Sequence, residues 1–110
     1  MITTPDSLSD LRERLRQFAA ERDWEQFHLP KNLAMSVAIE AAEIMERFQW
    51  LTPDESAALP EPQRAAVAHE IADVLLYLVR LADVLDIDPV QAALYKMAIN
   101  ARKYPVVRGI

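Results

Sequence analysis

Two short acidic motifs hold the residues of this chain whose types and spacing are best suited to chemistry. Glu40 and Glu43 form the first pair, and Glu70 and Asp73 form the second. A spacing of three residues places both carboxylates of a pair on one face of a helix. These faces are apolar rather than polar. The residues that share them are Leu33, Val37, Ile44 and Phe48 around the first pair, and Val67, Val74 and Leu81 around the second.

Two helices that pack through these faces would bring four carboxylates together inside the protein. Such a group must be protonated, paired with cations or bound to metal, because like charges repel strongly where water is excluded. Ligands that offer only oxygen favour a hard divalent cation, and Mg²⁺ is the natural choice. We therefore predict a magnesium site formed by Glu40, Glu43, Glu70 and Asp73. Glu43, ahead of Glu40, is our candidate for the base that orients or deprotonates a water molecule.

Other interpretations of the acidic pairs remain open at this stage. A single Glu-x-x-Glu on a helix is usually a solvated face, although two pairs within apolar stripes are less typical of one. A di-iron carboxylate bundle requires Glu-x-x-His motifs, and His69 precedes Glu70 instead of following it by three residues. A helix-mediated interaction module, or a nucleotide-binding protein without turnover, is a further alternative.

The acidic pairs depend on helices to position them, and the sequence predicts four. Apolar periodicity and capping residues predict helices over residues 8–22, 32–50, 62–85 and 89–103. Expected N-caps are Ser7, Thr52 in a capping box with Glu55 on a short turn, and Asp88 before Pro89. Only the tail, residues 104–110, could be a strand. We expect a single all-α domain over residues 1–110, built as a four-helix bundle.

The helix over residues 62–85 predicts self-association. Its polar residues occupy a narrow seam that includes Arg80 and Asp83, and it is apolar nearly all round. A helix of this kind is buried nearly all round. In a protein with four helices, the second apolar face most simply packs on another subunit, so we predict a homo-oligomer.

Composition excludes several other classes of protein. The chain has 110 residues with 12 Lys plus Arg against 17 Asp plus Glu, a net charge of −5, which disfavours binding to a nucleic acid polymer. It has no cysteine, and its one glycine is Gly109, so a glycine-rich phosphate-binding loop is excluded. The chain has no apolar run long enough to predict a membrane span. The N-terminus does not resemble a signal peptide, which predicts a cytoplasmic location.

The acidic motifs and several aromatic strings resemble the MazG-like all-α nucleoside triphosphate pyrophosphohydrolases, and within them the dCTP pyrophosphatase branch. The acidic pairs are separated by 26 residues, as in that family. The other strings with counterparts in the same order are ERDWEQFH (21–28), PKN (30–32), FQW (48–50), DVLLY (73–77) and KMAINARKYP (96–105). The resemblance covers nearly the whole chain.

The resemblance implies hydrolysis of a (deoxy)nucleoside triphosphate, with dCTP or a modified dCTP favoured, to the monophosphate and pyrophosphate. It implies Mg²⁺ at the four acids and a homotetramer. Hydrolysis of dUTP or phosphoribosyl-ATP is the alternative within the superfamily. The residues that match its substrate pocket or could contact substrate are Trp24, Glu25, Gln26, Phe27, His28, Trp50, Tyr77 and Asn100. The cations that could stabilise the leaving pyrophosphate are Lys31, Lys96, Arg102 and Lys103. Leu15 stands where some animal members have histidine. We predict Phe18 and Phe48 to be core residues.

Overall fold

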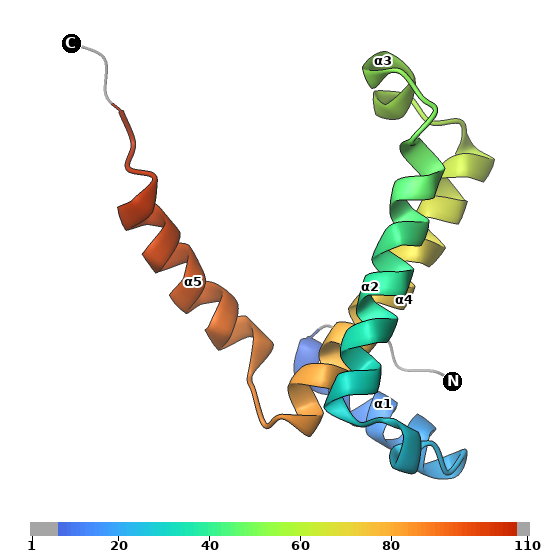
Figure 1. Ribbon diagram of the computed structural model, residues 1–110, viewed down its shortest axis with the longest axis vertical. Helices are drawn as coiled ribbons and strands as arrows, with labels where there is room; N and C mark the ends of the chain where they lie inside the picture. Colours follow the sequence, from blue (N-terminus) through green and yellow to red (C-terminus); the bar gives the residue numbers. More distant parts are fainter. Residues whose placement is uncertain (1–6, 108–110) are drawn as a thin grey trace.

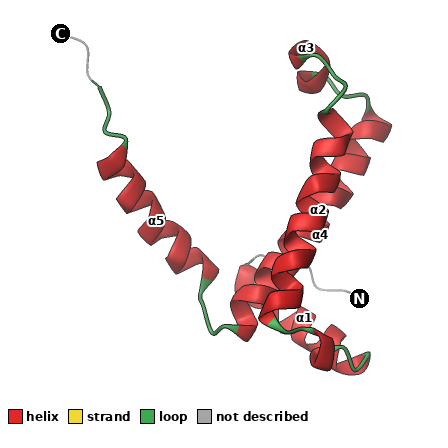
Figure 2. Ribbon diagram, viewed as in Figure 1, coloured by secondary structure: helices red, strands yellow, loops and turns green. Residues whose placement is uncertain are grey.

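The computed structural model describes residues 7–107 and is helical throughout (Figures 1 and 2). The elements in chain order are α1 (Leu8–Glu21), the short 3₁₀ turn η1 (Glu25–Phe27), α2 (Pro30–Phe48), α3 (Pro53–Ala57), α4 (Glu61–Val84) and α5 (Pro89–Lys103). No strand occurs within residues 7–107, which confirms the all-α prediction. Residues 104–107 of the tail are not a strand, and residues 108–110 lie outside the described part.

The helices begin at the capping residues that the sequence predicts. The Ser7 side chain accepts a hydrogen bond from the Asp10 amide at 3.2 Å. Thr52 and Glu55 form a reciprocal capping box at the start of α3. Each of these contacts satisfies amide groups that have no partner within the helix. α2 begins at Pro30, two residues earlier than expected, with proline in its first turn.

Aspartates take the place of glycine at the ends of α1 and α4. Asp23 and Asp86 have φ values of 57° and 55°, in the left-handed region. After Asp86, the Ile87 amide donates to the Ala82 carbonyl at 2.8 Å, and Asp86 itself donates to Asp83 at 3.0 Å. This pair of bonds is the Schellman arrangement, which usually has glycine at the left-handed position. Aspartate is one of the few other residues that tolerates that conformation, so a nearly glycine-free chain can still end its helices sharply.

α2 and α4 form an antiparallel pair, and α1 packs against α4 (Figure 1). α3 lies in the connection between α2 and α4, at the end of the pair remote from α1 (Figure 2). The buried apolar residues are few, namely Ala19 on α1, Leu33 on α2 and Val79 on α4. They mark the point where the three helices meet. This packing aligns the apolar stripes of α2 and α4, which is the arrangement that the acidic motifs require.

α5 departs from the bundle that the sequence predicts. It projects away from the other helices (Figure 1), and only its first turn borders α1 and α4, beside Leu8 and Val79. The radius of gyration is 17.4 Å, against about 13 Å for a compact domain of this length. Val90, Leu94 and Met97 follow one stripe of α5 and are 44%, 54% and 65% exposed. Within residues 7–107 the bundle is thus not closed, because no described segment covers this stripe.

The outer side of α4 is also uncovered. Ile71, Leu75 and Leu78 are 53%, 39% and 45% exposed. The sequence predicts that a second apolar face of this helix packs on another subunit. These side chains are exposed in a single chain, so this stays a prediction. None of the helices in residues 7–107 is long and apolar enough to cross a membrane.

A partly buried ion pair fastens α1 to α4. Arg16 donates through Nε and Nη2 to the two carboxylate oxygens of Asp83, at 2.7 and 2.5 Å. The Asp83 side chain is 7% exposed, whereas that of Arg16 is 47% exposed. The hydrogen bond from Arg16 lowers the pKa of Asp83 below its usual value, with further contributions from the charges of Arg16 and Arg80. The folded protein therefore stabilises the ionised form of Asp83 relative to its protonated form.

We expect Asp83→Asn to lower the free energy of unfolding by about 2 kcal/mol at pH 7, since charged hydrogen bonds contribute 1.5–3 kcal/mol. The pKa of Asp83 is lower in the folded than in the unfolded chain. The contribution of Asp83 to the free energy of unfolding is therefore complete above its pKa in the unfolded chain, about 3.9. This contribution is lost as the pH falls through its pKa in the folded protein. Urea unfolding between pH 7 and pH 2.5 measures this. Glu21→Gln, which removes an exposed ion pair with Arg22, is the control. If the difference in free energy of unfolding between Asp83→Asn and wild type does not narrow below about pH 4, the assignment is contradicted.

Candidate metal centre and adjoining cleft

Three of the four predicted ligands meet between α2 and α4. Glu40, Glu43 and Glu70 each place a carboxylate oxygen within 4.8 Å of the others. Glu40 and Glu43 are successive positions on one face of α2, and Glu70 faces them from α4 because the two helices run side by side. Such spacing suits a small ion held between oxygen ligands.

The crowding of these acids changes their protonation. Hydrogen bonds to Glu70 and Glu40, together with their charges, raise the pKa of Glu43 to about 7. The hydrogen bond from Glu43 lowers the pKa of Glu70, and Arg47 acts in the same direction. Arg47 Nη2 lies 3.2 Å from Glu70 Oε1, and the Glu70 side chain is 12% exposed. Without a bound cation, the crowding of these acids therefore favours the protonated form of Glu43.

The cluster fits a divalent cation. Glu40 Oε2 and Glu70 Oε2 are buried, and neither has a hydrogen-bond partner among the described residues. A buried carboxylate oxygen without a partner is costly, and a cation would satisfy both oxygens at once. A set of oxygen donors from carboxylates is the type that Mg²⁺ prefers, so the residues present fit the ion predicted from the sequence.

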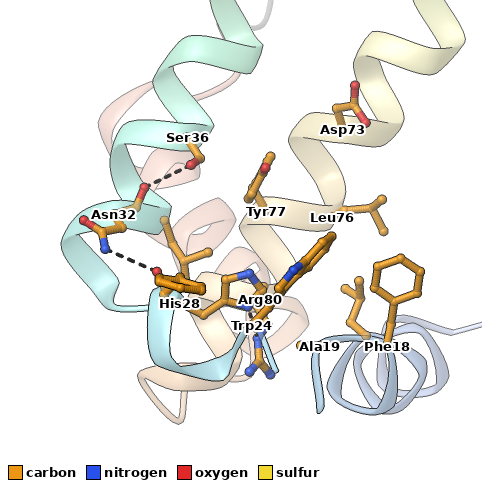
Figure 3. A pocket seen from close by; sticks show the side chains of 13 residues that line it. Phe18, Ala19, Trp24, His28, Asn32, Ser36, Asp73, Leu76, Tyr77 and Arg80 are labelled. Atoms are coloured by element: carbon orange, nitrogen blue, oxygen red, sulfur yellow. Dashed lines mark hydrogen bonds between the residues drawn. The ribbon is translucent and has the colours of Figure 1, made fainter. Parts of the chain in front are cut away.

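Asp73 stands apart from this group. It lies on α4 one turn after Glu70, is exposed, and lines the cleft that adjoins the cluster (Figure 3). The structure thus brings together Glu40, Glu43 and Glu70 and places Asp73 at the border between cluster and cleft.

The cleft has a volume of about 420 Å³ and lies between α1, η1, α2 and α4 (Figure 3). Its size is within the range of small-molecule sites. It is mainly apolar and aromatic, with a few polar groups. The residues that line it are Leu15, Phe18, Ala19, Trp24, Phe27, His28, Asn32, Leu33, Ser36, Asp73, Leu76, Tyr77 and Arg80.

The order of residues along the two helices joins the cleft to the acidic cluster. Asn32, Ser36 and Glu40 follow one another at intervals of one turn on α2. On α4, Tyr77 and Glu70 are two turns apart. Because the helices are antiparallel, the aromatic end of the cleft leads along both of them to the carboxylates. With a divalent cation on the carboxylates, a ligand with an aromatic end and an anionic end would fit this sequence of surfaces.

Aromatic rings gather at the end of the cleft that is remote from the acidic cluster. The centroids of Phe18 and Trp24 are 5.6 Å apart in an edge-to-face arrangement, and Arg22 lies 3.5 Å from the centre of the Phe18 ring. Phe18 is 44% exposed. Its prediction as a core residue was wrong, because α5 does not cover this side of α1 and the ring forms a wall of the cleft instead.

The predicted residues of the aromatic string divide into two sets. Trp24, Phe27 and His28 line the cleft together with Tyr77, as does Leu15. Glu25 and Gln26 belong to η1 but are not among the lining residues. Gln26 Nε2 instead donates to the Asp23 carbonyl at 3.1 Å and so supports the turn.

The remaining predicted contacts lie away from the cleft in a single chain. Trp50 follows the far end of α2 and is 87% exposed. Lys31 is exposed in the first turn of α2. The other four lie on the projecting α5 or at its end, and they are Lys96, Asn100, Arg102 and Lys103. Within residues 7–107 of a single chain, none of these side chains lines the cleft.

Sequence reasoning missed two cations that the site uses. Arg47 pairs with Glu70, and Arg80 lies under the cleft, where its Nε donates to His28 Nδ1 at 3.0 Å. The signal for Arg80 was present, because it falls in the polar seam of an otherwise apolar helix. Arg47 carried no such signal, since it looks like an ordinary basic residue in the last turn of α2.

The fold and the site together define a class: an all-helical protein with a carboxylate cluster between two antiparallel helices and an aromatic cleft beside it. The chain belongs to the MazG-like family, whose model matches residues 35–109. That match begins before the first acidic pair and includes both pairs and α5. The family predicted from the sequence is confirmed.

Individual relatives are similar over nearly all of the chain. dCTP pyrophosphatase 1 of Bos taurus is 48% identical over an alignment of 106 positions that covers 91% of this chain and 60% of the relative. The Homo sapiens protein of that name is 48% identical over 105 residues, 90% of this chain and 59% of the relative. The chain thus spans about three fifths of the length of these curated relatives. The crystal structure of a pyrophosphatase from Archaeoglobus fulgidus superposes with a TM-score of 0.86 at 43% identity, covering 96% of this chain and 99% of the other.

Proposed function

We propose that this protein is a Mg²⁺-dependent nucleoside triphosphate pyrophosphohydrolase. Its favoured substrate is dCTP or a modified dCTP, and its products are the monophosphate and pyrophosphate. The observation that carries the proposal is the carboxylate cluster with two unpartnered buried oxygens, Glu40 Oε2 and Glu70 Oε2, at the end of an aromatic cleft. The names of the similar proteins, dCTP pyrophosphatase 1 and pyrophosphatase, support the same reaction class.

The two ends of the site suit the two ends of such a substrate. Trp24, Phe27 and Tyr77 offer ring faces and edges to a base, and stacking of this kind contributes about 1–3 kcal/mol per base at other nucleic-acid sites. Glu40, Glu43, Glu70 and, from the border of the cleft, Asp73 would hold Mg²⁺. When bound, the ion would supply positive charge to the triphosphate and lower the pKa of a coordinated water.

Glu43 is the residue that we assign as general base, with Glu40 orienting the same water. A base works best when its pKa lies near the working pH. Glu40 and Glu70 raise the pKa of Glu43 toward neutrality in the metal-free protein, which supports the choice of Glu43 as the carboxylate that accepts a proton.

We also propose that the working form is a homo-oligomer, with the tetramer implied by the family resemblance as the expected state. Among the described residues that line the cleft, the one cation is Arg80, which is engaged with His28 and Asp83. Lys96, Arg102 and Lys103 lie on or beside the projecting α5, together with its uncovered apolar stripe. Packing of α5 on a second copy would cover the stripe and bring these cations to the cleft, where they would stabilise the leaving pyrophosphate.

Incubation with each canonical dNTP and NTP, with and without Mg²⁺, tests the proposal when pyrophosphate and orthophosphate are resolved by chromatography. We expect pyrophosphate in stoichiometric amounts with the monophosphate, only in the presence of Mg²⁺, and with dCTP or 5-methyl-dCTP turned over fastest. Turnover of dUTP ahead of dCTP would change the substrate but keep the class. Binding of nucleotides without any pyrophosphate would instead indicate the non-catalytic alternative.

A further inference from the structure

Arg80 is a buried cation directly beneath the cleft. The residue is 9% exposed. Its Nε donates to Nδ1 of His28 at 3.0 Å, and its Nη1 lies 3.4 Å from Asp83 Oδ2. Arg16 holds Asp83 from the other side at 2.7 Å and 2.5 Å. The guanidinium of Arg80 is thus fixed between an anchored carboxylate and the imidazole ring.

This contact determines where the proton of His28 lies. A guanidinium can only donate hydrogen bonds, so the Nδ1 atom that receives this one must carry a lone pair. In a neutral imidazole the remaining proton is then on Nε2. The two ring nitrogens point in opposite directions, so Nε2–H is directed away from Arg80. His28 lines the cleft, with Asn32, Ser36 and Tyr77 nearby in Figure 3.

We propose that Arg80 is a positioning residue that fixes His28 as the Nε2–H tautomer, so that the cleft presents a neutral hydrogen-bond donor to an acceptor atom of the nucleoside. The proposal rests on the proposed function and deepens it. The acceptor is a carbonyl oxygen, a ring nitrogen or a sugar oxygen. An amino group at the same place would leave two donors face to face, and a buried unpaired donor is penalised strongly.

The surroundings keep His28 uncharged as well as oriented. Burial lowers the pKa of His28, and the positive charge of Arg80 lowers it further. Arg80 itself does not need to touch substrate to have this effect. Because the anchor of Arg80 is the Arg16–Asp83 pair, the ring of His28 is coupled to the contact between α1 and α4.

The tautomer can be observed directly by NMR of ¹⁵N-histidine-labelled protein. The chain has only two histidines, and His69→Gln assigns their signals. At pH 7 we expect an unprotonated Nδ1 and a protonated Nε2 for His28 in the wild type. Arg80→Met should convert this to a mixture of tautomers. A proton on Nδ1 of His28 in the wild type overturns the proposal without any variant.

Binding of α,β-methylene-dCTP, a non-hydrolysable analogue, gives the second measurement. Removing the positioning contact should weaken binding and raise KM for dCTP by about three- to tenfold, the equivalent of one hydrogen bond, while kcat changes less than about twofold. Arg64→Met on the same helix, whose side chain is 75% exposed, is the matched control and should change neither value. Unchanged affinity and an unchanged tautomer in Arg80→Met contradict the proposal.

A second variant separates positioning from folding. Arg80→Lys keeps the buried charge and one donor, so we expect it to restore the tautomer and most of the affinity that Arg80→Met loses. If both variants unfold, the ¹⁵N NMR spectrum of the wild type still tests which tautomer His28 adopts. Failure of the wild type to bind any nucleotide would contradict the proposed function, whereas binding with the wrong tautomer would contradict only the role of Arg80.

Discussion

Glu40→Gln is expected to reduce pyrophosphohydrolase activity by more than about 100-fold, since loss even of a residue that supports a metal ligand costs 10–100-fold. The substitution keeps the size and polarity of the side chain but removes a carboxylate that faces Glu43 and Glu70. Activity with dCTP at saturating Mg²⁺ and calorimetric titration with Mg²⁺ measure the two losses. Activity and affinity for Mg²⁺ should fall together if Glu40 is a metal ligand.

The stability of this variant distinguishes a metal ligand from a structural residue. Glu40 Oε2 is buried without a hydrogen-bond partner, and its neighbours carry like charge. Relief of this repulsion should leave the metal-free Glu40→Gln protein at least as stable as the wild type, with the same circular dichroism. Glu61→Gln, on an exposed side chain at the start of α4, is the control for loss of one negative charge. Wild-type activity in Glu40→Gln, or loss of the helical signal along with activity, would contradict the assignment.

Leu94→Glu is expected to convert the protein from an oligomer to the 12.5 kDa monomer. Leu94 lies in the middle of the apolar stripe of α5 and is 54% exposed in a single chain. Burial of a leucine contributes about 1.5–3 kcal/mol, and a twofold interface counts it twice, so the dissociation constant should rise at least about 100-fold. Light scattering across a concentration series measures the mass. Activity should fall with the fraction of oligomer, because α5 carries the proposed pyrophosphate contacts.

Ala92→Glu is the matched control for this experiment. It introduces the same charge on α5 at a position about half a turn from the stripe, and glutamate is a good helix former at either site. A wild-type protein that is monomeric at micromolar concentration and still fully active would contradict the assembly. A Leu94→Glu protein that stays oligomeric would show that another surface, such as the exposed side of α4, holds the subunits together.

The helices and their ends were predictable because their causes are local. Ser7, Thr52 and Asp88 cap the helices that the sequence assigns to them, since the cap and the amides that it satisfies lie within three residues of one another. The pairing of the acidic motifs was predictable for a related reason. A three-residue spacing fixes a helix face, and the apolar residues on that face predicted the meeting of Glu40, Glu43 and Glu70, whereas Asp73 is exposed.

The limits of prediction begin where one helix meets another. Sequence patterns placed Asp73 with Glu70, but the structure groups Glu70 with Glu40 and Glu43, pairs it with Arg47, and places Asp73 beside the cleft. Phe18 was assigned to the core because its helix has an apolar stripe. Whether a stripe is covered depends on the neighbouring helix, and α5 leaves this one open to the cleft.

The sequence by itself determined an all-helical family member with two acidic pairs on its helices and an aromatic string before α2. It also excluded a glycine-rich phosphate-binding loop, since the only glycine of the chain is Gly109. Only the tertiary structure decided which carboxylates meet, that α5 projects away from the other helices, and that Arg80 donates a hydrogen bond to His28. These outcomes depend on packing and charge between residues such as His28 and Arg80, 52 positions apart. Helical periodicity fixes the face on which a side chain lies, but the distance to a partner on another helix is set by everything that packs between them.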